Sequence, residues 1–213
     1  GDPSPVTAYG VYMGIKACAQ AKYSDDSLAG KHVAVQGLGH VGYYLCKDLA
    51  EEGAKLTVTD IDQDRVKQVV DEFGAEAVEP DAIYAVDADI FAPCALGAIV
   101  NDDTIDVLNV DIVAGAANNQ LARGPIHGPA LDERGILYAP DYVINAGGLI
   151  NVYGEIEGWS PERSKRKAGD IYNTLMRTFE LATTEGLAPH AAANKVAETR
   201  IREARHLQRT YLS

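Results

Sequence analysis

The sequence predicts an α/β fold: a doubly wound, mostly parallel sheet (Rossmann-like in its layering) with additional C-terminal helices. Two observations predict it. Short runs rich in aliphatic and β-branched residues alternate with stretches whose apolar residues recur at helical spacing, as in strand–helix–strand units with parallel strands. From about residue 145 the pattern becomes entirely helical. The 213 residues, 46% of them hydrophobic, are enough for one large domain or two small ones.

The first predicted element is a helix that begins at Ser4-Pro5. Serine can cap a helix and proline suits its first turn. Between Thr7 and Ala21, apolar residues then recur on one face. After a polar break, residues 32–36 (HVAVQ) form an aliphatic run bounded by glycines, which predicts a short buried strand.

Two further strand–helix steps follow with the same logic. Residues 40–52 have apolar side chains at i, i+4 and i+8, and Gly53 stands where a helix stop is expected. Residues 55–59 (KLTVT) predict a second strand, because β-branched residues dominate the run. Residues 62–73 again place their apolar side chains on one face, which predicts a helix.

The later elements are less regular. Three more strands are predicted, at residues 88–92, 111–114 and 135–138. Beyond them only helices are expected. A long helix is predicted over 160–184, after Ser160-Pro161, and a last helix is predicted from about Pro189 into the basic tail.

Composition excludes several kinds of partner. The net charge of −12 repels phosphate backbones and anionic lipids, so neither nucleic acid nor a membrane is an expected partner. No apolar run reaches the roughly 20 residues of a membrane span. The three cysteines are far apart and form no CxxC motif, which indicates a reducing, cytoplasmic setting. The five histidines lack metal-ligand spacing, so no metal site is expected.

Residues 36–42 read QGLGHVG and contain the pattern GxGxxG. The pattern follows a predicted strand directly and opens a predicted helix. An acidic residue, Asp60, ends the next strand, 18 residues past Gly42. This is the arrangement of a dinucleotide-binding fingerprint. The alternative is a strand–turn–helix whose glycines serve packing only, with Asp60 as a solvated strand end.

The fingerprint gives each glycine a physical role. Gly37 allows the tight turn, Gly39 lets the backbone approach the pyrophosphate, and Gly42 lets the helix pack closely on the strand. The amides at the start of the helix, at His40 and Val41, are expected to bind the phosphates with the help of the helix dipole.

The acidic residue indicates which dinucleotide is bound. Asp60, with Ile61 beside it, is expected to contact the adenine ribose and to accept hydrogen bonds from its hydroxyls. A 2′-phosphate would instead meet the Asp60 carboxylate, with Asp62 nearby and no arginine before Arg65. NAD is therefore the expected cofactor, rather than NADP.

Several segments together resemble one enzyme family, the Glu/Leu/Phe/Val amino acid dehydrogenases, and especially its leucine dehydrogenase branch. The resemblance covers most of the chain in order, and its segments are GDPSPVTAYGVY (1–12), VAVQGLGHVGYYLC (33–46), TDID (59–62), DIFAPCALGAI (89–99), AGAANNQL (114–121) and YAPDYVINAGGLINV (138–152). It implies a cofactor domain of an enzyme that oxidatively deaminates an apolar L-amino acid to a 2-oxo acid and ammonia, with NAD as hydride acceptor.

The same resemblance implies that part of the enzyme lies elsewhere. Family members carry an N-terminal substrate domain with two functional lysines and an aspartate, and no segment here matches it. Lys16, Lys22 and Lys31 lie outside every matching motif and are assigned no such role. The chain is therefore expected to be one NAD-binding domain without catalytic residues, inactive alone. The alternative is a non-catalytic or engineered NAD-binding module.

Within that single domain, three parts are expected. Residues 1–30 would form a linking helix, residues 31–144 the nucleotide-binding core, and residues 145–213 a C-terminal helical segment. The C-terminal helices are expected to pack on the substrate domain, or to lead to a homo-oligomer where they are exposed.

The resemblance also assigns cofactor contacts outside the glycine loop. Thr7 corresponds to a cofactor-contacting threonine, although its hydroxyl could simply satisfy an amide at the helix start. Cys94 and Ala95 follow the end of a strand, where ligands bind in open α/β sheets. Cys94 could equally be a small buried hydrophobic residue, and no basic neighbour indicates a reactive thiol.

The nicotinamide end of the cofactor is assigned in the same way. Ala116, Ala117 and Asn118 resemble the segment that touches the nicotinamide ribose, although Asn118-Asn119 could also make a turn. Asn145 resembles the asparagine that faces the nicotinamide and the substrate carboxylate, and it could also cap a helix N-terminus.

Two residues resemble the family's substrate side-chain pocket. Leu175 and Thr178 align with these positions, and their alternative is one face of an amphipathic helix. Leu175 favours an apolar substrate. Thr178 departs from the branched aliphatic residue of the leucine enzymes, so the choice among leucine, valine, phenylalanine and tryptophan stays open.

Overall fold

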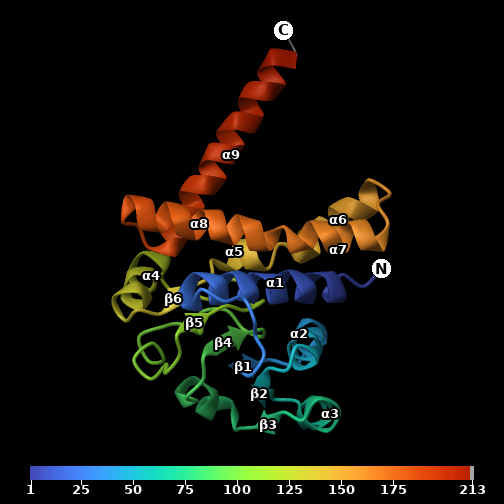
Figure 1. The fold of residues 1–213 in the computed structure, drawn as a ribbon, viewed down its shortest axis with the longest axis vertical. Coiled ribbons are helices and arrows are strands. Elements are labelled where there is room, and N and C mark those ends of the chain that lie inside the picture. Colours follow the sequence, from blue (N-terminus) through green and yellow to red (C-terminus); the bar gives the residue numbers. More distant parts are fainter. Residues whose placement is uncertain (212–213) are drawn as a thin grey trace.

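A six-stranded parallel sheet organises the chain (Figure 1). The computed structural model describes residues 1–211, with side-chain surroundings up to Arg202. The sheet has the spatial order β3-β2-β1-β4-β5-β6, and its strands are β1 (His32–Gln36), β2 (Lys55–Thr59), β3 (Glu76–Ala77), β4 (Ile90–Pro93), β5 (Ile112–Val113) and β6 (Leu137–Tyr138). This order, with its reversal between β1 and β4, is that of dinucleotide-binding folds and confirms the predicted fold class.

Alternate residues of the central strand face two separate cores. Val33 and Val35 of β1 point into a core that α1 (Ser4–Tyr23) and α2 (His40–Glu51) cover, whereas Ala34 and Phe91 point into the other. The second core is closed by the 3₁₀ helix η1 (Pro80–Ala85), by α4 (Gly124–Glu133) and by the loop between β4 and β5. Because both faces are covered, the strands are continuous apolar runs rather than alternating ones.

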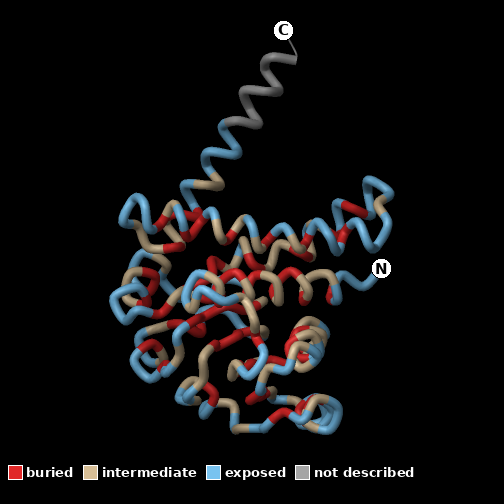
Figure 2. Tube along the Cα trace, viewed as in Figure 1, coloured by how far each residue is buried: buried red, intermediate tan, exposed pale blue. Residues whose placement is uncertain are grey.

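Helix α3 (Gln63–Phe73) lies next to α2 and β3 at the edge of the sheet. The remaining helices follow α1 on its other side, and they are α5 (Asp141–Ile144), α6 (Gly147–Ile156), α7 (Pro161–Gly169), α8 (Ile171–Glu185) and α9 (Pro189–Tyr211). Helix α1 packs against α2 on one side and against α6, α7 and α8 on the other. Helix α9 projects away from the body after its first turns (Figure 2), and its described side chains are exposed from Glu198 to Arg202. No helix in the described part of the chain combines the length and apolarity of a membrane span.

Several predicted boundaries differ from the structure. Ser4 does not cap α1: it is the first helical residue and is buried, while the Asp2 carboxylate accepts a hydrogen bond from its amide at 2.9 Å. The helix predicted over 160–184 is two helices, α7 and α8, which meet at Asp170 next to Gly169, a poor helix former. The three late strands are shorter than predicted, because their ladders contain only two to four residues.

Candidate functional site

The glycine loop between β1 and α2 contains two glycines that the fold itself requires. Gly37 has φ +93°, and a Cβ there would lie 2.6 Å from the Ala95 Cβ. A Cβ on Gly42 would lie only 2.0 Å from the carbonyl oxygen of Gly37. A side chain on Gly42 would therefore separate α2 from the loop, and one on Gly37 would push the loop away from Ala95.

Gly39 is different, because nothing in the fold requires it. Its φ of −62° suits any residue, and the nearest protein atom to a Cβ there would be Arg65 Nη1 at 3.8 Å. Gly39 lines a pocket of about 600 Å³. Packing alone therefore explains Gly37 and Gly42 but leaves Gly39 without a reason. The missing side chain keeps the pocket open beside the start of α2.

The first turn of α2 has free backbone donors directly after Gly39, although His40 and Val41 themselves do not line the pocket. No side chain caps this helix, whereas Asp62 caps α3 and Ser160 caps α7. The first amide of α2 to bond within the helix is that of Tyr43, which donates to Gly39 at 2.8 Å. The amides of His40 and Val41 are therefore available, and the positive end of the helix dipole adds to their attraction for an anion.

Asp60 links the end of β2 to the glycine loop. Its Oδ2 accepts from the Leu38 amide at 2.5 Å and its Oδ1 accepts from the Asp62 amide at 2.9 Å. The carboxylate is partly buried and lines the same pocket, so it is not a freely solvated strand end. Each carboxylate oxygen keeps acceptor capacity for a further donor. Ile61, beside it, is 91% exposed at the pocket wall.

The far wall of the pocket comes from the end of β4. Cys94 and Ala95 both line it, and the Cys94 amide donates to the Gln36 carbonyl at 2.7 Å. Burial raises the pKa of the Cys94 thiol to about 12, so the thiol stays protonated at neutral pH. Cys94 is thus a neutral wall residue, which agrees with the expectation that its thiol is unreactive.

The structure brings Asn118 and Asn145 into direct contact. Asn145 Nδ2 donates to Asn118 Oδ1 at 2.6 Å and to the Ala116 carbonyl at 3.3 Å. Asn145 does not cap a helix N-terminus as the alternative had it: it ends α5, and Ala146 precedes α6. Asn119 has φ +51°, so Asn118-Asn119 does form a turn. The same turn leaves Asn118 in contact with Asn145.

Thr7 lies near the same end of the site. Its hydroxyl donates to the Pro3 carbonyl at 2.9 Å, so it satisfies a carbonyl rather than an amide. A Cβ on Gly148 would lie 3.0 Å from the Thr7 oxygen. Thr7 therefore packs against the start of α6, three residues after Asn145.

These residues share one edge of the sheet. In the spatial order of the strands, Asp60 follows β2, the glycine loop follows β1, Cys94 ends the β4 region, and Ala116–Asn118 follow β5. Asn145 follows β6 through the short helix α5. The carboxyl ends of parallel strands meet at one edge, which is where open α/β sheets bind ligands.

The two predicted substrate residues lie on α8 and are both fully buried. Leu175 packs under α1, where a Cβ on Gly14 would lie 3.1 Å from Leu175 Cδ1. Thr178 donates its hydroxyl to the Thr174 carbonyl at 2.9 Å and borders a second pocket. Both therefore also belong to the buried face of an amphipathic helix, and their substrate role stays a prediction.

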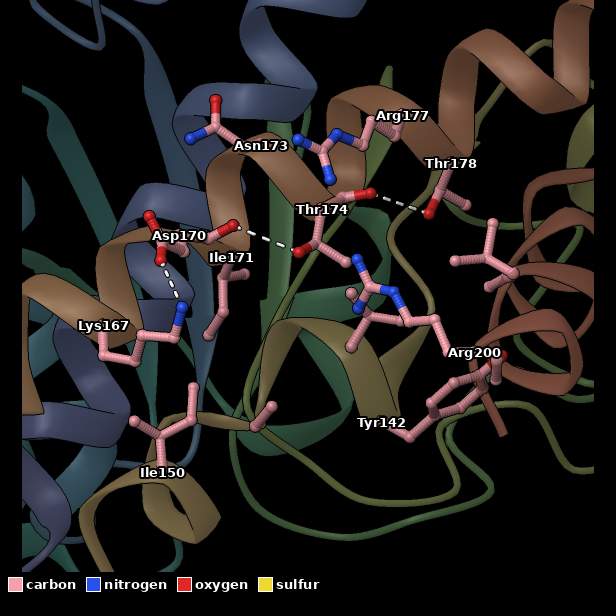
Figure 3. Close-up of a pocket in the computed structure, with 15 residues that line it drawn as sticks. Tyr142, Ile150, Lys167, Asp170, Ile171, Asn173, Thr174, Arg177, Thr178 and Arg200 are labelled. Atoms are coloured by element: carbon pink, nitrogen blue, oxygen red, sulfur yellow. Dashed lines mark hydrogen bonds and ion pairs between the residues drawn. The ribbon is translucent and has the colours of Figure 1, made fainter. Parts of the chain in front are cut away.

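The second pocket, of about 630 Å³, lies between α5, α6, α8 and α9 (Figure 3). Ile150 and Ile171 contribute apolar surface, and Lys167, Arg177 and Arg200 bring basic groups to it. Lys167 is paired with Asp170 at 2.9 Å. None of the predicted cofactor residues lines this pocket, whereas six of them line the first pocket: Gly37, Gly39, Asp60, Ile61, Cys94 and Ala95. The other predicted cofactor residues line neither of these two pockets: Thr7, His40, Val41, Gly42, Ala116, Ala117, Asn118 and Asn145.

Sequence reasoning missed several residues of the first pocket. Gln36 Nε2 donates to the Tyr84 hydroxyl at 2.7 Å, and Gln36 Oε1 is buried with no partner. Gln36 had one available signal, because it is the polar end of an otherwise aliphatic buried strand. Tyr84 had none, since η1 was not predicted.

The distance of Arg65 from Asp60 along the chain had suggested that no arginine is near, yet the first turn of α3 brings Arg65 to the pocket.

Gln120 was also missed, and it supports the loop after β5. It is fully buried, and its Nε2 donates to the carbonyls of Gly115 and Ala117, each at 2.9 Å. Its own amide donates to Asp141 Oδ2 at 2.9 Å. Gln120 therefore fixes the backbone on both sides of Ala116.

Comparisons with known proteins agree with this fold. Leucine dehydrogenase from Thermoactinomyces intermedius is 56% identical over 212 residues, which are 100% of this chain and 58% of that protein. The crystal structure of L-tryptophan dehydrogenase from Nostoc punctiforme superposes with a TM-score of 0.93 at 48% identity, covering 97% of this chain and 63% of that one. Hetero-hexameric glutamate dehydrogenase from Thermus thermophilus, 22% identical with a TM-score of 0.77, shares the fold.

The chain thus spans about 58% of the length of the curated relatives it matches. The family model described as Glutamate/Leucine/Phenylalanine/Valine dehydrogenase matches residues 2–64 and 57–209, nearly the whole chain. The chain belongs to the Glutamate/Leucine/Phenylalanine/Valine dehydrogenase family.

Proposed function

We propose that this chain binds NAD and forms the cofactor-binding part of an L-amino acid dehydrogenase that acts on an apolar substrate. One observation carries the proposal: Gly39 lines the pocket but has no steric reason within the fold to be glycine. A diphosphate lying against bare backbone at this point supplies that reason. The buried, unpartnered Gln36 Oε1 at the same pocket also fits a site that receives a ligand with hydrogen-bond donors.

The residues present fit the parts of NAD in order along the sheet edge. Asp60 and Ile61 would hold the adenosine ribose, and the amides of His40 and Val41 would bind the diphosphate. Cys94 and Ala95 would line the path towards the nicotinamide. At its far end, Ala116–Asn118, Asn145 and Thr7 would contact the nicotinamide ribose and ring. When bound, NAD supplies the hydride acceptor for oxidation of the amino acid.

The charges of the pocket favour NAD over NADP. Asp60, Asp62 and Asp81 all line it, against one basic side chain, Arg65. A ribose hydroxyl can donate to Asp60, whereas a 2′-phosphate would be repelled by the three carboxylates.

Asn145 and the helical layer would serve the substrate. An asparagine can donate to a substrate carboxylate without adding a charge, and Asn118 and Ala116 fix the orientation of its amide. We assign Leu175 and Thr178 to the wall of the side-chain pocket. The relatives are named for leucine and for L-tryptophan, so an apolar side chain is the common feature.

The catalytic groups are proposed to lie outside this chain. Family members hold their functional lysines and aspartate in an N-terminal substrate domain, and the chain spans only 58% of its relatives' length. We propose that residues 1–30, 31–144 and 145–213 form one NAD-binding domain that requires such a domain for turnover. The three free cysteines, two of them fully buried, fit a reducing, cytoplasmic setting.

Titration of the chain with NADH tests the proposal directly. We expect weak but measurable binding, at millimolar concentration or below, and no turnover of L-leucine with NAD by the chain alone. Addition of a family substrate domain should restore activity; binding without rescue would favour a non-catalytic NAD-binding module. No NADH binding at millimolar concentration would refute the proposal.

A matched pair of glycine variants sharpens the test. Gly39→Ala should fold normally, because its Cβ meets no protein atom closer than 3.8 Å, but should lose most NADH affinity. Gly124→Ala is the control, since a Cβ there has no neighbour within 4 Å and lies outside the pocket. Equal NADH affinity for Gly39→Ala and the wild type would contradict the role given to Gly39.

A further inference from the structure

The first pocket contains one basic side chain among its lining residues, Arg65. The other charged groups of the lining are the carboxylates of Asp60, Asp62 and Asp81. A chain with net charge −12 repels any polyanion, and the free amides of α2 carry only partial charges. Arg65 therefore supplies the one full positive charge among the lining residues that can attract an anionic ligand into this pocket.

Arg65 stands beside the glycine loop, not at the outer rim. Its Nη1 lies 3.8 Å from the point where a Cβ on Gly39 would be. The bare backbone of Gly39 and the Arg65 guanidinium thus line the same pocket, and the free amides of α2 follow Gly39 directly along the chain. Each is a group that proteins use to bind phosphate oxygens.

Arg65 is held by Asp62. Arg65 Nε lies 3.2 Å from Asp62 Oδ2, and both side chains are roughly half exposed, at 51% and 43%. Exposed pairs of this kind are weak. The other Asp62 oxygen, Oδ1, is already occupied by the amides of Asp64 and Arg65, which it caps. Asp62 therefore stays in place while Arg65 is free to turn towards a stronger anion.

We propose that Arg65 binds the diphosphate of the dinucleotide, exchanging its contact with Asp62 for a phosphate oxygen. The inference rests on the proposed function and adds a specific ionic contact to it. The planar guanidinium presents several donors in a fixed fork, which suits two phosphate oxygens better than a lysine ammonium does. Asp62 in turn keeps the guanidinium close to the loop before the ligand arrives.

Binding titrations with NADH on the whole chain test the proposal. Arg65→Ala should weaken NADH binding about tenfold, and Arg65→Lys about threefold, because lysine keeps the charge but loses the fork. Lys67→Ala is the matched control: it removes one positive charge from the same helix, is paired with Asp71, and lies outside the pocket. The control should change NADH affinity less than twofold. Thermal unfolding of each variant checks that the fold is kept.

Further ligands locate the contact. Arg65→Ala should weaken ADP binding as it weakens NADH binding, but should leave adenosine, which has no phosphate, unchanged. Asp62→Asn keeps the helix cap but removes the charge that competes for Arg65. It should therefore tighten NADH binding in the wild-type background, and it should tighten binding less when it is combined with Arg65→Ala.

The outcomes separate this inference from the proposed function. Loss of NADH and ADP affinity in Arg65→Ala, with Lys67→Ala unchanged, supports the contact. Equal NADH affinity of Arg65→Ala and wild type overturns it, while the proposed function stands. A loss restricted to NADPH assigns Arg65 to the 2′-position and also overturns the diphosphate contact. Failure of the wild type itself to bind NADH refutes the proposed function.

Discussion

At the scale of single residues, the site depends on groups that do not touch the proposed cofactor. Gln120 is the clearest of them, since its side chain ties two carbonyls of the loop that holds Ala116. Its Oε1 is buried without a partner, so the residue also carries a desolvation cost. A polar side chain with that cost is retained where it fixes backbone that an apolar one would release.

Gln120→Met tests this support. Methionine has a similar shape but leaves the carbonyls of Gly115 and Ala117 without their donor, while it removes the unpartnered Oε1. We expect a net loss of about 1–2 kcal/mol in the free energy of unfolding, measured by urea denaturation. Residues 115–119 should also exchange their amide hydrogens faster. Unchanged exchange in this loop would show that Gln120 does not hold it.

At the scale of elements, one carboxylate joins α1 to α2. Glu52, just after α2, accepts from the Tyr12 hydroxyl at 2.5 Å and from Lys16 Nζ at 2.6 Å, both on α1. It also accepts from the Leu28 amide at 3.1 Å. Burial by itself raises the pKa of Glu52, but the hydrogen bonds from Lys16, Tyr12 and Leu28 outweigh it, so the pKa lies below its usual value of 4.5.

This shift has a defined effect on acid stability. A carboxyl whose pKa is lower in the folded chain stabilises the fold above its unfolded pKa, and that contribution is lost as the pH falls through the folded pKa. Glu52→Gln should therefore cost about 1–2 kcal/mol in the free energy of unfolding at pH 7. The difference from wild type should stay constant down to about pH 5 and shrink below it.

Denaturant unfolding of both proteins between pH 3 and pH 8 gives the measurement. Glu51→Gln, at the neighbouring exposed position, is the control and should leave unfolding nearly unchanged. A difference between Glu52→Gln and wild type that grows as the pH falls below 4 would contradict a lowered pKa for Glu52 in the folded chain.

The elements also show why prediction from sequence succeeded unevenly. Strands β1 and β2 were predicted to the residue, because their five-residue ladders coincide with the aliphatic run HVAVQ and the β-branched run KLTVT. Helix α4 was missed, since its sequence GPIHGPALDE carries two prolines and two glycines, and tertiary packing overrides that weak propensity. The break at Asp170 was missed because no proline separates α7 from α8, and Gly169 alone marks the boundary.

The same contrast holds for the candidate site. The glycines and Asp60 were predictable, because their roles depend on spacing along the chain. Three other residues were not predictable: Arg65, Tyr84 and Gln120. Their contacts exist only because the packed sheet and helices bring the partners together.

At the scale of the whole molecule, α6 carries an apolar stripe that the described chain does not cover. Leu149, Val152, Tyr153 and Ile156 recur at i, i+3, i+4 and i+7 and are 47–77% exposed. Such spacing is typical of a helix face that packs against another element. We propose that copies of the chain pair through this stripe.

The stripe is small, so pairing of the chain alone should be weak. Four side chains bury far less than the roughly 800 Å² per partner of a stable interface, and the net charge of −12 opposes contact between copies. We expect a monomer at micromolar concentration that dimerises towards millimolar concentration. Dimerisation should strengthen as salt screens the like charges. Light scattering across a concentration series, at low and high salt, measures both effects.

A pair of charge substitutions assigns the surface. Leu149→Lys with Ile156→Lys should abolish the dimer, because each places an ammonium group in the contact while both positions, 76% and 77% exposed, tolerate the change in the monomer. Ile126→Lys is the control, since Ile126 is 49% exposed on α4 and outside the stripe. The control also reduces the negative net charge, so it should dimerise at least as strongly as wild type. A dimer that survives the double substitution, or a wild type that stays monomeric at high salt and millimolar concentration, would rule out α6 as a self-association surface.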